Sequence, residues 1–178
     1  MNSIIKFDGR VAIEAILYLA SRSKYPTFHH IFKLLYLADR CHLARYGRLI
    51  YGDCYVAMKH GPVPSSTYDI LKSIRHESAF APTKEMASSI SVRGNHHIVA
   101  MRPANLEWLS DSDIECLDEA LRKYDAMSFE QLTNLTHDDA WKSADKDDII
   151  SFAILVKSVD KANKLDGSLL AHLENPFP

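Results

Sequence analysis

The chain has 178 residues, of which 47% are hydrophobic and 25% are charged, the composition of an ordinary globular domain. This composition excludes a collagen-like chain, a low-complexity chain and wholesale disorder. The net charge of −2 hides an asymmetry, because residues 1–80 carry 11 Lys and Arg against 6 Asp and Glu, a net of +5, whereas residues 81–178 carry 10 against 17, a net of −7. Such polarity is typical of a protein that meets a nucleic acid or an acidic protein, or whose two faces attract one another on folding.

Two helices are predicted in the first 50 residues. Apolar residues recur at three- and four-residue spacing over 9–22, directly after Asp8, which is suited to cap this helix. The second helix is predicted over 27–46, with Thr27 as its N-cap and Gly47 as its terminator.

The middle of the chain is predicted to hold a loop, a short helix and a hairpin. Residues 48–64 are punctuated by Gly and Pro, so we expect an ordered loop with at most a short extended piece. A helix over 65–76 follows, capped by Ser65 or Ser66. Residues 89–101 alternate apolar and polar side chains around Gly94-Asn95, which predicts a β-hairpin with a two-residue turn.

The acidic half is predicted to be helical. Ser110-x-x-Asp113 and Ser128-x-x-Gln131 have the pattern of capping boxes, and a longer helix is expected after Asp147-Asp148, with Ile149 on its apolar side. These elements predict a mainly α fold: a single compact domain of about six helices over 1–174, with one small β-hairpin near 89–101 and a frayed tail at 175–178.

Several classes of protein are not expected from the sequence. No apolar run reaches the ~20 residues of a membrane span and no signal-type leader begins the chain, so we expect a cytoplasmic protein without a membrane partner. Cys41, Cys54 and Cys116 are odd in number and lack CxxC spacing, which argues against a disulfide framework and a cysteine zinc site. We expect them to be reduced and mostly buried.

The helix over 27–46 carries the most unusual polar residues. Projected at helical pitch, His29, Lys33, Tyr36 and Arg40 share one narrow side, which we expect to face solvent.

Asp39 and His42 instead project into the apolar arc of this helix, three residues apart, where their side chains are expected to meet. Such a pair can serve as a general base, as half of a metal site or as a structural contact. A structural pair is favoured, because a metal site needs three or four ligands and no other histidine has matching spacing.

Other signatures of chemistry are missing. The chain has no P-loop, no G-x-S-x-G and no G-x-G-x-x-G, and Cys41 lies in an apolar helix where a thiol is more typical of the core than of a nucleophile. We therefore expect no catalytic residue, no metal and no cofactor. Basic residues interleave with tyrosines in the first half, but +5 over 80 residues is a weak footprint, so a nucleic-acid partner is not expected.

The segment Lys59-His60-Gly61-Pro62-Val63-Pro64-Ser65 is a second feature of interest. Gly61 and Pro62 predict a sharply bent, rigid structural loop just before a helix. The free amides of that helix could receive a carboxylate or a phosphate, or the prolines could simply set the first turn of the helix.

Four segments together resemble a known family. They are, in chain order, Lys33-Leu34-Leu35-Tyr36-Leu37-Ala38, His42-Leu43-Ala44-Arg45-Tyr46-Gly47, Lys59-His60-Gly61-Pro62-Val63 with Tyr68 following, and Leu135-Thr136-His137 with Trp141. Their order and spacing resemble the Panacea domain family of SocA-like antitoxins over roughly 27–142. The family often has tryptophan where this chain has Met58 and Cys41, which keeps both positions apolar but leaves partner choice open.

The resemblance implies a non-enzymatic bacterial or phage-borne protein, usually encoded beside a small toxin that it neutralises, typically by direct binding. One family member instead hands its toxin to a cellular protease. The expected partner is thus a cognate protein toxin, with proteolytic adapter, metal-dependent enzyme using Asp39 and His42, and nucleic-acid-binding regulator as alternatives.

We expect a recognition surface in the region of the second helix and the loop after it, because Tyr and Arg are strong interface formers. Trp141 is expected to lie buried behind this surface, in the core. The surface is expected to comprise Lys33, Tyr36, Tyr46, Lys59, His60 and Tyr68.

Overall fold

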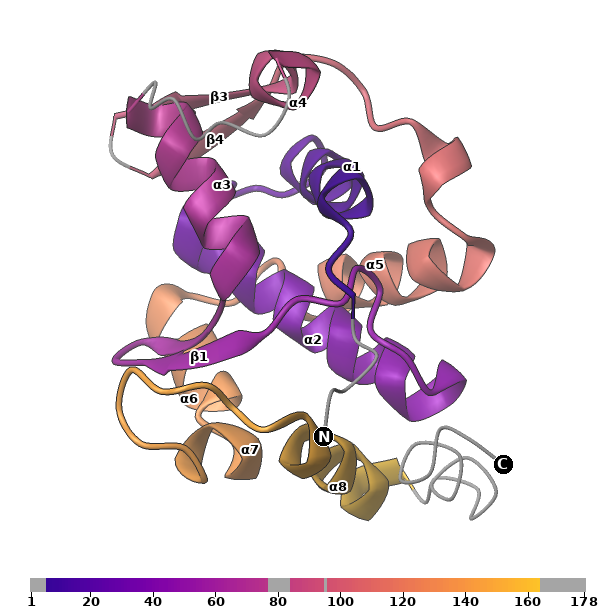
Figure 1. The fold of residues 1–178 in the computed structure, drawn as a ribbon, viewed down its shortest axis with the longest axis vertical. Coiled ribbons are helices and arrows are strands. Elements are labelled where there is room, and N and C mark those ends of the chain that lie inside the picture. The colour runs from indigo at the N-terminus through magenta and orange to yellow at the C-terminus, as the bar shows by residue number, and fades with distance from the viewer. Residues whose placement is uncertain (1–5, 77–83, 95, 164–178) are drawn as a thin grey trace.

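The fold is organised around one long helix. A computed structural model describes residues 6–76, 84–94 and 96–163, and α2 (Phe28–Tyr46) runs through its centre (Figure 1). α1 (Gly9–Ala20) and α5 (Asp111–Tyr124) pack against α2, as does α8 (Phe152–Asn163) near the far end of the ribbon. The protein is mainly α, as predicted.

The remaining helices are shorter. Within the described ranges there are eight α-helices, where the sequence predicts about six. α4 and α7 are absent from the prediction, because six and four residues are too few to show a helical period. The bounds of the short elements are Ser65–His76 for α3, Lys84–Ser89 for α4, Phe129–Thr136 for α6, Asp139–Lys142 for α7 and Leu106–Trp108 for a 3₁₀ turn.

Helix ends follow the local chemistry of the sequence. The Thr27 hydroxyl accepts a hydrogen bond from His30 N, and Gly47 ends α2 in the left-handed region with φ 71°. Both predicted capping boxes, at Ser110 and Ser128, are present. These signals involve neighbours within four residues, which is why the sequence alone locates them.

The predicted hairpin is present, with β3 (Ile90–Arg93) antiparallel to β4 (His97–Ala100). Because Arg93 pairs with His97, the connection is one residue longer than the predicted two-residue turn. Gly94 takes a positive φ of 57°, as the turn requires. Asn95, the other predicted turn residue, lies outside the described residues.

A second hairpin corrects the prediction of a loop over 48–64. β1 (Tyr55–Met58) pairs with β2 (Gly61–Pro64), and Met58 opposite Gly61 leaves Lys59 and His60 as a tight turn. The prolines of β2 are tolerated because β2 is an edge strand whose outer side needs no N–H donors.

The other edge of β1 is covered by the segment 147–150. Ile150 N donates to Tyr55 O at 2.8 Å, and Ala57 N donates to Asp148 O at 2.8 Å. Ile149 therefore lies in an extended segment beside β1, and its predicted place in the last helix is wrong, since α8 begins at Phe152. The unpaired edge of β1 offers these residues backbone partners that a helix start would not supply.

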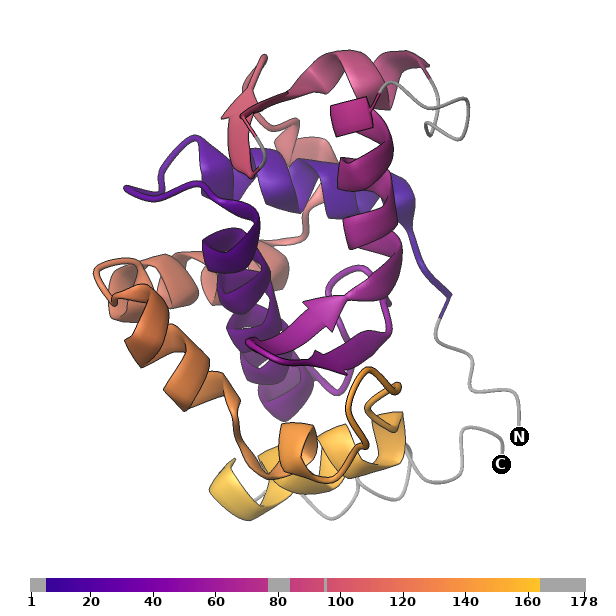
Figure 2. The ribbon, with the colours of Figure 1, turned by 90° about the vertical axis from the view of Figure 1, so that its left-hand side faces the viewer.

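Two apolar clusters lie on different sides of α2. The larger one joins α2 to α1, α3, α5 and the hairpin β3–β4, and the smaller one joins it to β1, α7 and α8. Figure 2 shows α2 between these two groups of elements. Trp141, predicted to be buried, is half-buried at the margin of the smaller cluster. The helices in the described part of the chain include none that is long and apolar enough to cross a membrane.

Candidate partner-binding site

Lys33 and Tyr36 are buried, which corrects the prediction that their side of α2 faces solvent. Lys33 is 1% exposed, and its Nζ donates to Pro62 O at 2.9 Å. Tyr36 is fully buried, and its hydroxyl donates to Asp138 Oδ2 at 2.8 Å. The hairpin β1–β2 and α6 both pack on α2. When residues 48–64 are interpreted as a loop, no predicted element covers this side of α2, so it is predicted to face solvent.

Gly61 and Pro62, predicted to form a structural loop, lie instead in strand β2. Gly61 has φ +97°, and a Cβ added there would lie 2.7 Å from Thr136 Oγ1 and 2.9 Å from Lys33 Cε. Only glycine meets both demands, the backbone conformation and the close approach. The hairpin turn is therefore locked onto α2 and α6.

The N-terminus of α3 is already occupied by a carboxylate of the chain itself. Asp53 Oδ1 accepts from Ser66 N at 3.0 Å, and Asp53 Oδ2 accepts from both Thr67 N and Thr67 Oγ1 at 2.8 Å. The predicted cap at Ser65 or Ser66 is replaced by Asp53, and these amides are not free for an external anion. Asp53 lies 13 residues before Ser66, so no local pattern predicts it as the cap of α3.

Asp39 fastens the segment after α2 to the helix. It is fully buried, Oδ1 accepts from Ile50 N and Oδ2 from the Tyr55 hydroxyl, each at 2.7 Å. Burial raises the pKa of Asp39 to about 7, against the opposing effect of these two hydrogen bonds. Asp39 is buried, as predicted, but its hydrogen bonds go to Ile50 and Tyr55 rather than to His42.

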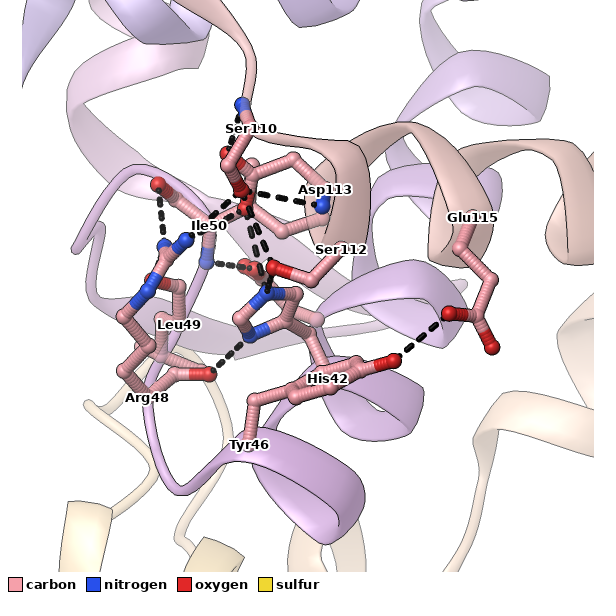
Figure 3. A network of polar contacts seen from close by, with 10 residues as sticks. His42, Tyr46, Arg48, Leu49, Ile50, Ser110, Ser112, Asp113 and Glu115 are labelled. Carbon is pink, nitrogen blue, oxygen red and sulfur yellow. Dashed lines mark hydrogen bonds and ion pairs between the residues drawn. The ribbon is translucent and has the colours of Figure 1, made fainter.

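His42 finds its carboxylate on α5 instead. Its Nε2 lies 3.1 Å from Asp113 Oδ1 and 3.0 Å from Ser112 Oγ, and its Nδ1 lies 2.9 Å from Arg48 O (Figure 3). Arg48 Nη2 donates to the same Asp113 oxygen at 2.8 Å. Burial would raise the pKa of Asp113, but the hydrogen bonds from His42 and Ser110 outweigh it and hold the pKa at about 2. The predicted Asp39–His42 pair is thus two separate contacts.

The Ser112–His42 contact superficially resembles a nucleophile beside a general base. In a nucleophile–base arrangement the carboxylate holds the ring nitrogen opposite the one that faces the nucleophile. Here Ser112 Oγ and Asp113 Oδ1 both lie at Nε2, and Nδ1 faces the Arg48 carbonyl. This arrangement clamps α2, the following segment and α5 together (Figure 3). Among the described residues, no group of three or more His, Cys, Asp and Glu side chains is placed to hold a metal ion.

The opposite end of α2 carries a different arrangement, at the turn of β1–β2. Lys59 and His60 are exposed there. The ring of His29 stacks on Phe129 with centroids 3.8 Å apart, and the ring of His60 meets the same phenylalanine at 5.3 Å. Burial, followed by the charge of Lys33, lowers the pKa of His29 to about 3. Phe129 was not singled out from the sequence, because a single aromatic residue in a short helix carries no motif.

His137 and Trp141 support the same turn from the other side. Their rings stack in parallel with centroids 3.7 Å apart, and Trp141 Nε1 donates to Met58 O at 3.0 Å. The His137 ring also hydrogen-bonds to the backbone of Lys59, while its Nε2 is buried with no hydrogen-bond partner among the described residues. The segment from α6 to α7 therefore holds the hairpin in place.

The six predicted partner-binding residues do not form one neighbourhood. Tyr46 lies 13 residues after Lys33 on the same helix, about 20 Å away at helical rise, and its hydroxyl donates to Glu115 Oε2 at 2.6 Å. Tyr68 packs edge-on against Phe32 with ring centroids 5.7 Å apart. Lys33 and Tyr36 lie beneath the surface, which leaves Lys59 and His60 as the exposed pair at the hairpin.

The contacts described above, except those of His29, lie within residues 31–142. Residues 31–142 match the family model described as antitoxin SocA-like, Panacea domain. Neither the comparison with curated proteins nor the comparison with solved structures gave a match. The family description supports an antitoxin role, which implies a toxin as partner and suggests a non-enzymatic protein. Because this match spans well over half of the chain, the protein belongs to the family of SocA-like antitoxins that share the Panacea domain.

Proposed function

We propose that this protein neutralises a cognate protein toxin by direct binding, without chemistry of its own, and that the hairpin β1–β2 and α6 form the contact surface. The observation that supports this proposal most strongly is the exposed turn Lys59-His60, which lies beside Phe129. The side chain of Phe129 is itself 52% exposed. Exposed aromatic and basic side chains on one face are the groups that most often anchor a protein partner.

The rigidity of the turn supports this proposal. Lys33 holds it through Pro62 O, Gly61 fits against Thr136 without space for a side chain, and Trp141 holds Met58 O. A surface that is already ordered loses little conformational entropy when a partner binds.

The roles of the predicted residues are revised accordingly. We propose Lys59 and His60, joined by Phe129, as contact residues, and Lys33 and Tyr36 as the support beneath them, whereas Tyr68 packs on Phe32 in the larger apolar cluster. Tyr46 lies at the other end of α2, so its contact with a partner would need a second surface.

Co-expression with the neighbouring toxin tests the proposal. The probe is a small protein, encoded beside the gene of this chain, whose expression alone stops growth. Direct neutralisation requires that growth returns, that the toxin level on an immunoblot is unchanged, and that the two proteins co-purify. Loss of the toxin only when a cellular protease is active would instead identify a proteolytic adapter.

A matched pair of substitutions tests the surface. Phe129→Ala is expected to weaken the complex about tenfold or more, because it removes an exposed aromatic anchor. Met101→Ala is the control, since Met101 is an exposed apolar side chain beside β4, far from the hairpin β1–β2. Equal affinities of both variants and the wild-type chain, measured by calorimetry, would place the surface elsewhere.

A further inference from the structure

Basic side chains gather around the turn of β1–β2 without a carboxylate bound to any of them. This basic cluster comprises His29 and Lys33 from α2, Lys59 and His60 from the turn, and His137 after α6. The ring of His29 hydrogen-bonds to the backbone of His60, and the ring of His137 to the backbone of Lys59, so the groups are neighbours. In the part of the chain that the structure describes, none of the five forms an ion pair with Asp or Glu.

The acidic residue next to the cluster in the chain already has other hydrogen-bond and ion-pair partners. Asp138 directly follows His137, but its Oδ2 accepts from the Tyr36 hydroxyl at 2.8 Å and pairs with Arg40 at 3.2 Å. Its Oδ1 accepts from Trp141 N at 3.0 Å. No Asp or Glu of the described residues is therefore paired with the cluster, although buried charges in proteins are usually paired.

Two members of the cluster have unused donor capacity. Lys33 can donate three hydrogen bonds, but Pro62 O is its one acceptor in the described structure. His137 Nε2 is buried without a partner in the same part of the chain. Buried polar atoms are satisfied in most native structures, so an unpartnered His137 Nε2 beside an exposed turn indicates a group that arrives from outside.

The surroundings favour one acidic side chain over a polyanion. Glu130 and Asp139 are exposed on α6 and α7, so the basic side chains do not continue over these helices as the extended basic face that a nucleic-acid backbone requires. The exposed ring of Phe129 provides an apolar shelf next to the charges, which suits the stem of a protein side chain.

We propose that the basic cluster receives an acidic side chain of the protein toxin, seated between the turn Lys59-His60 and Phe129. This inference rests on the proposed function and adds the chemistry of the partner. Lys59 and His60 contact the carboxylate, while Lys33 and His137 act beneath them as positive charge and donor.

Binding of a carboxylate at this cluster is expected to change the protonation of Lys33 and His137. Burial lowers the pKa of Lys33 to about 7, and burial followed by the charge of Lys33 lowers the pKa of His137. The charges that lower the pKa of His137 are those of Lys33, His60 and Lys142. The carboxylate of Asp138, next to His137 in the chain, contacts Tyr36 and Arg40. A carboxylate that arrives here favours the protonated forms, so binding takes up protons and weakens as the pH rises from 6 to 8.

Charge reversal is the experiment that tests the inference. The double variant Lys59→Glu with His60→Glu is measured by calorimetry against the neighbouring toxin, with Lys84→Glu as the matched control. Lys84 is exposed at the start of α4, at the opposite end of the ribbon from β1 (Figure 1). The double variant is expected to bind at least about tenfold more weakly and the control as the wild type does. A set of toxin variants with single Asp→Lys or Glu→Lys changes is then screened for one that restores neutralisation by the double variant.

Proton uptake by the wild-type complex provides a second measurement that requires no variant to fold. Binding heats in two buffers of different ionisation enthalpy are expected to reveal uptake near pH 7. Unchanged affinity of the double variant, absence of any restoring toxin variant, or absence of proton uptake would overturn the inference while leaving direct binding intact. Salt-dependent capture of RNA at this turn in competition with the toxin would overturn it as well. No binding by the wild-type chain would overturn the proposed function and this inference together.

Discussion

Two buried basic side chains of α2, His42 near its C-terminal end and Lys33 near its N-terminal end, differ in whether a carboxylate compensates them. At the C-terminal end, His42 and Arg48 meet the ionised carboxylate of Asp113. At the N-terminal end, Lys33 is as deeply buried but has a single carbonyl as partner. A compensated network stabilises a fold, whereas an uncompensated one costs stability and is retained where a partner supplies the missing charge. The contrast separates the structural end of the helix from the end that we assign to recognition.

The largest expected effect is at Asp39, in the C-terminal half of α2, which accepts hydrogen bonds from two buried donors. Asp39→Ala leaves Ile50 N and the Tyr55 hydroxyl buried without an acceptor, which is expected to cost about 3 kcal/mol of unfolding free energy. Urea unfolding measures this loss. Asp69→Ala is the control, because Asp69 is exposed and pairs with Lys72 on the surface of α3. A loss for Asp39→Ala no larger than that of the control would mean that the carboxyl does not hold this segment.

The next effect tests how tightly the turn is locked at the recognition end. Gly61→Ala and Gly94→Ala both place a side chain at positive φ, but only Gly61 has atoms within 3 Å of the added Cβ. Gly61→Ala is therefore expected to destabilise the protein by about 2 kcal/mol more than Gly94→Ala, since overpacking adds to backbone strain. Thermal unfolding of the two variants gives the difference, and equal losses would show that the turn is loose.

Acid titration sharpens the structural end of the comparison. The pKa of Asp113 is about 2 in the folded protein against an ordinary value of 3.8, so the unfolded chain binds more protons between these values. Stability from this group is present above pH 4 and is lost as the pH falls from about 4 to about 2, by about 2 kcal/mol. In Asp113→Asn this part of the acid profile is expected to flatten. An unchanged acid profile would show that the contacts of Asp113 with His42 and Arg48 do not stabilise the folded protein.

Alkaline titration tests Lys33, at the recognition end, through the difference in protons bound by the folded and the unfolded chain. The pKa of Lys33 is about 7 in the folded protein against an ordinary value of 10.5, so the unfolded chain holds a proton that the folded chain has lost. Stability is expected to rise between pH 7 and 10 by at most about 1.4 kcal/mol per pH unit. Lys33→Met is expected to remove this slope, measured as the difference between the two unfolding profiles. A slope that persists in Lys33→Met would mean that the lysine is already compensated.

Local signals in the sequence located most helices. Thr27, Gly47 and the two capping boxes are recognisable because each acts on a backbone group within four residues. The hairpin β1–β2 was beyond such signals, since β1 is held by Ile150 and Asp148, nearly a hundred residues away along the chain. Proline is uncommon within strands, so the prolines of β2 also prevented its prediction from the sequence.

The candidate site was predictable in its segments but not in its geometry. The family resemblance includes the turn Lys59-His60 and the Thr136-His137 segment. Burial of Lys33 depends on the hairpin β1–β2, which was not predicted from the sequence. The carboxylate that meets His42 comes from Asp113, on another helix. Partners of this kind are fixed by tertiary packing, which periodicity within one helix cannot report.

Amide hydrogen exchange of the wild-type protein, free and bound to the neighbouring toxin, tests the central claim most directly. The account requires new protection at residues 58–62 and 129–137, around the basic cluster, and little change at residues 110–115, around Asp113. Protection confined to 110–115 and the C-terminal end of α2, with the hairpin unchanged, would contradict the assignment of the two ends.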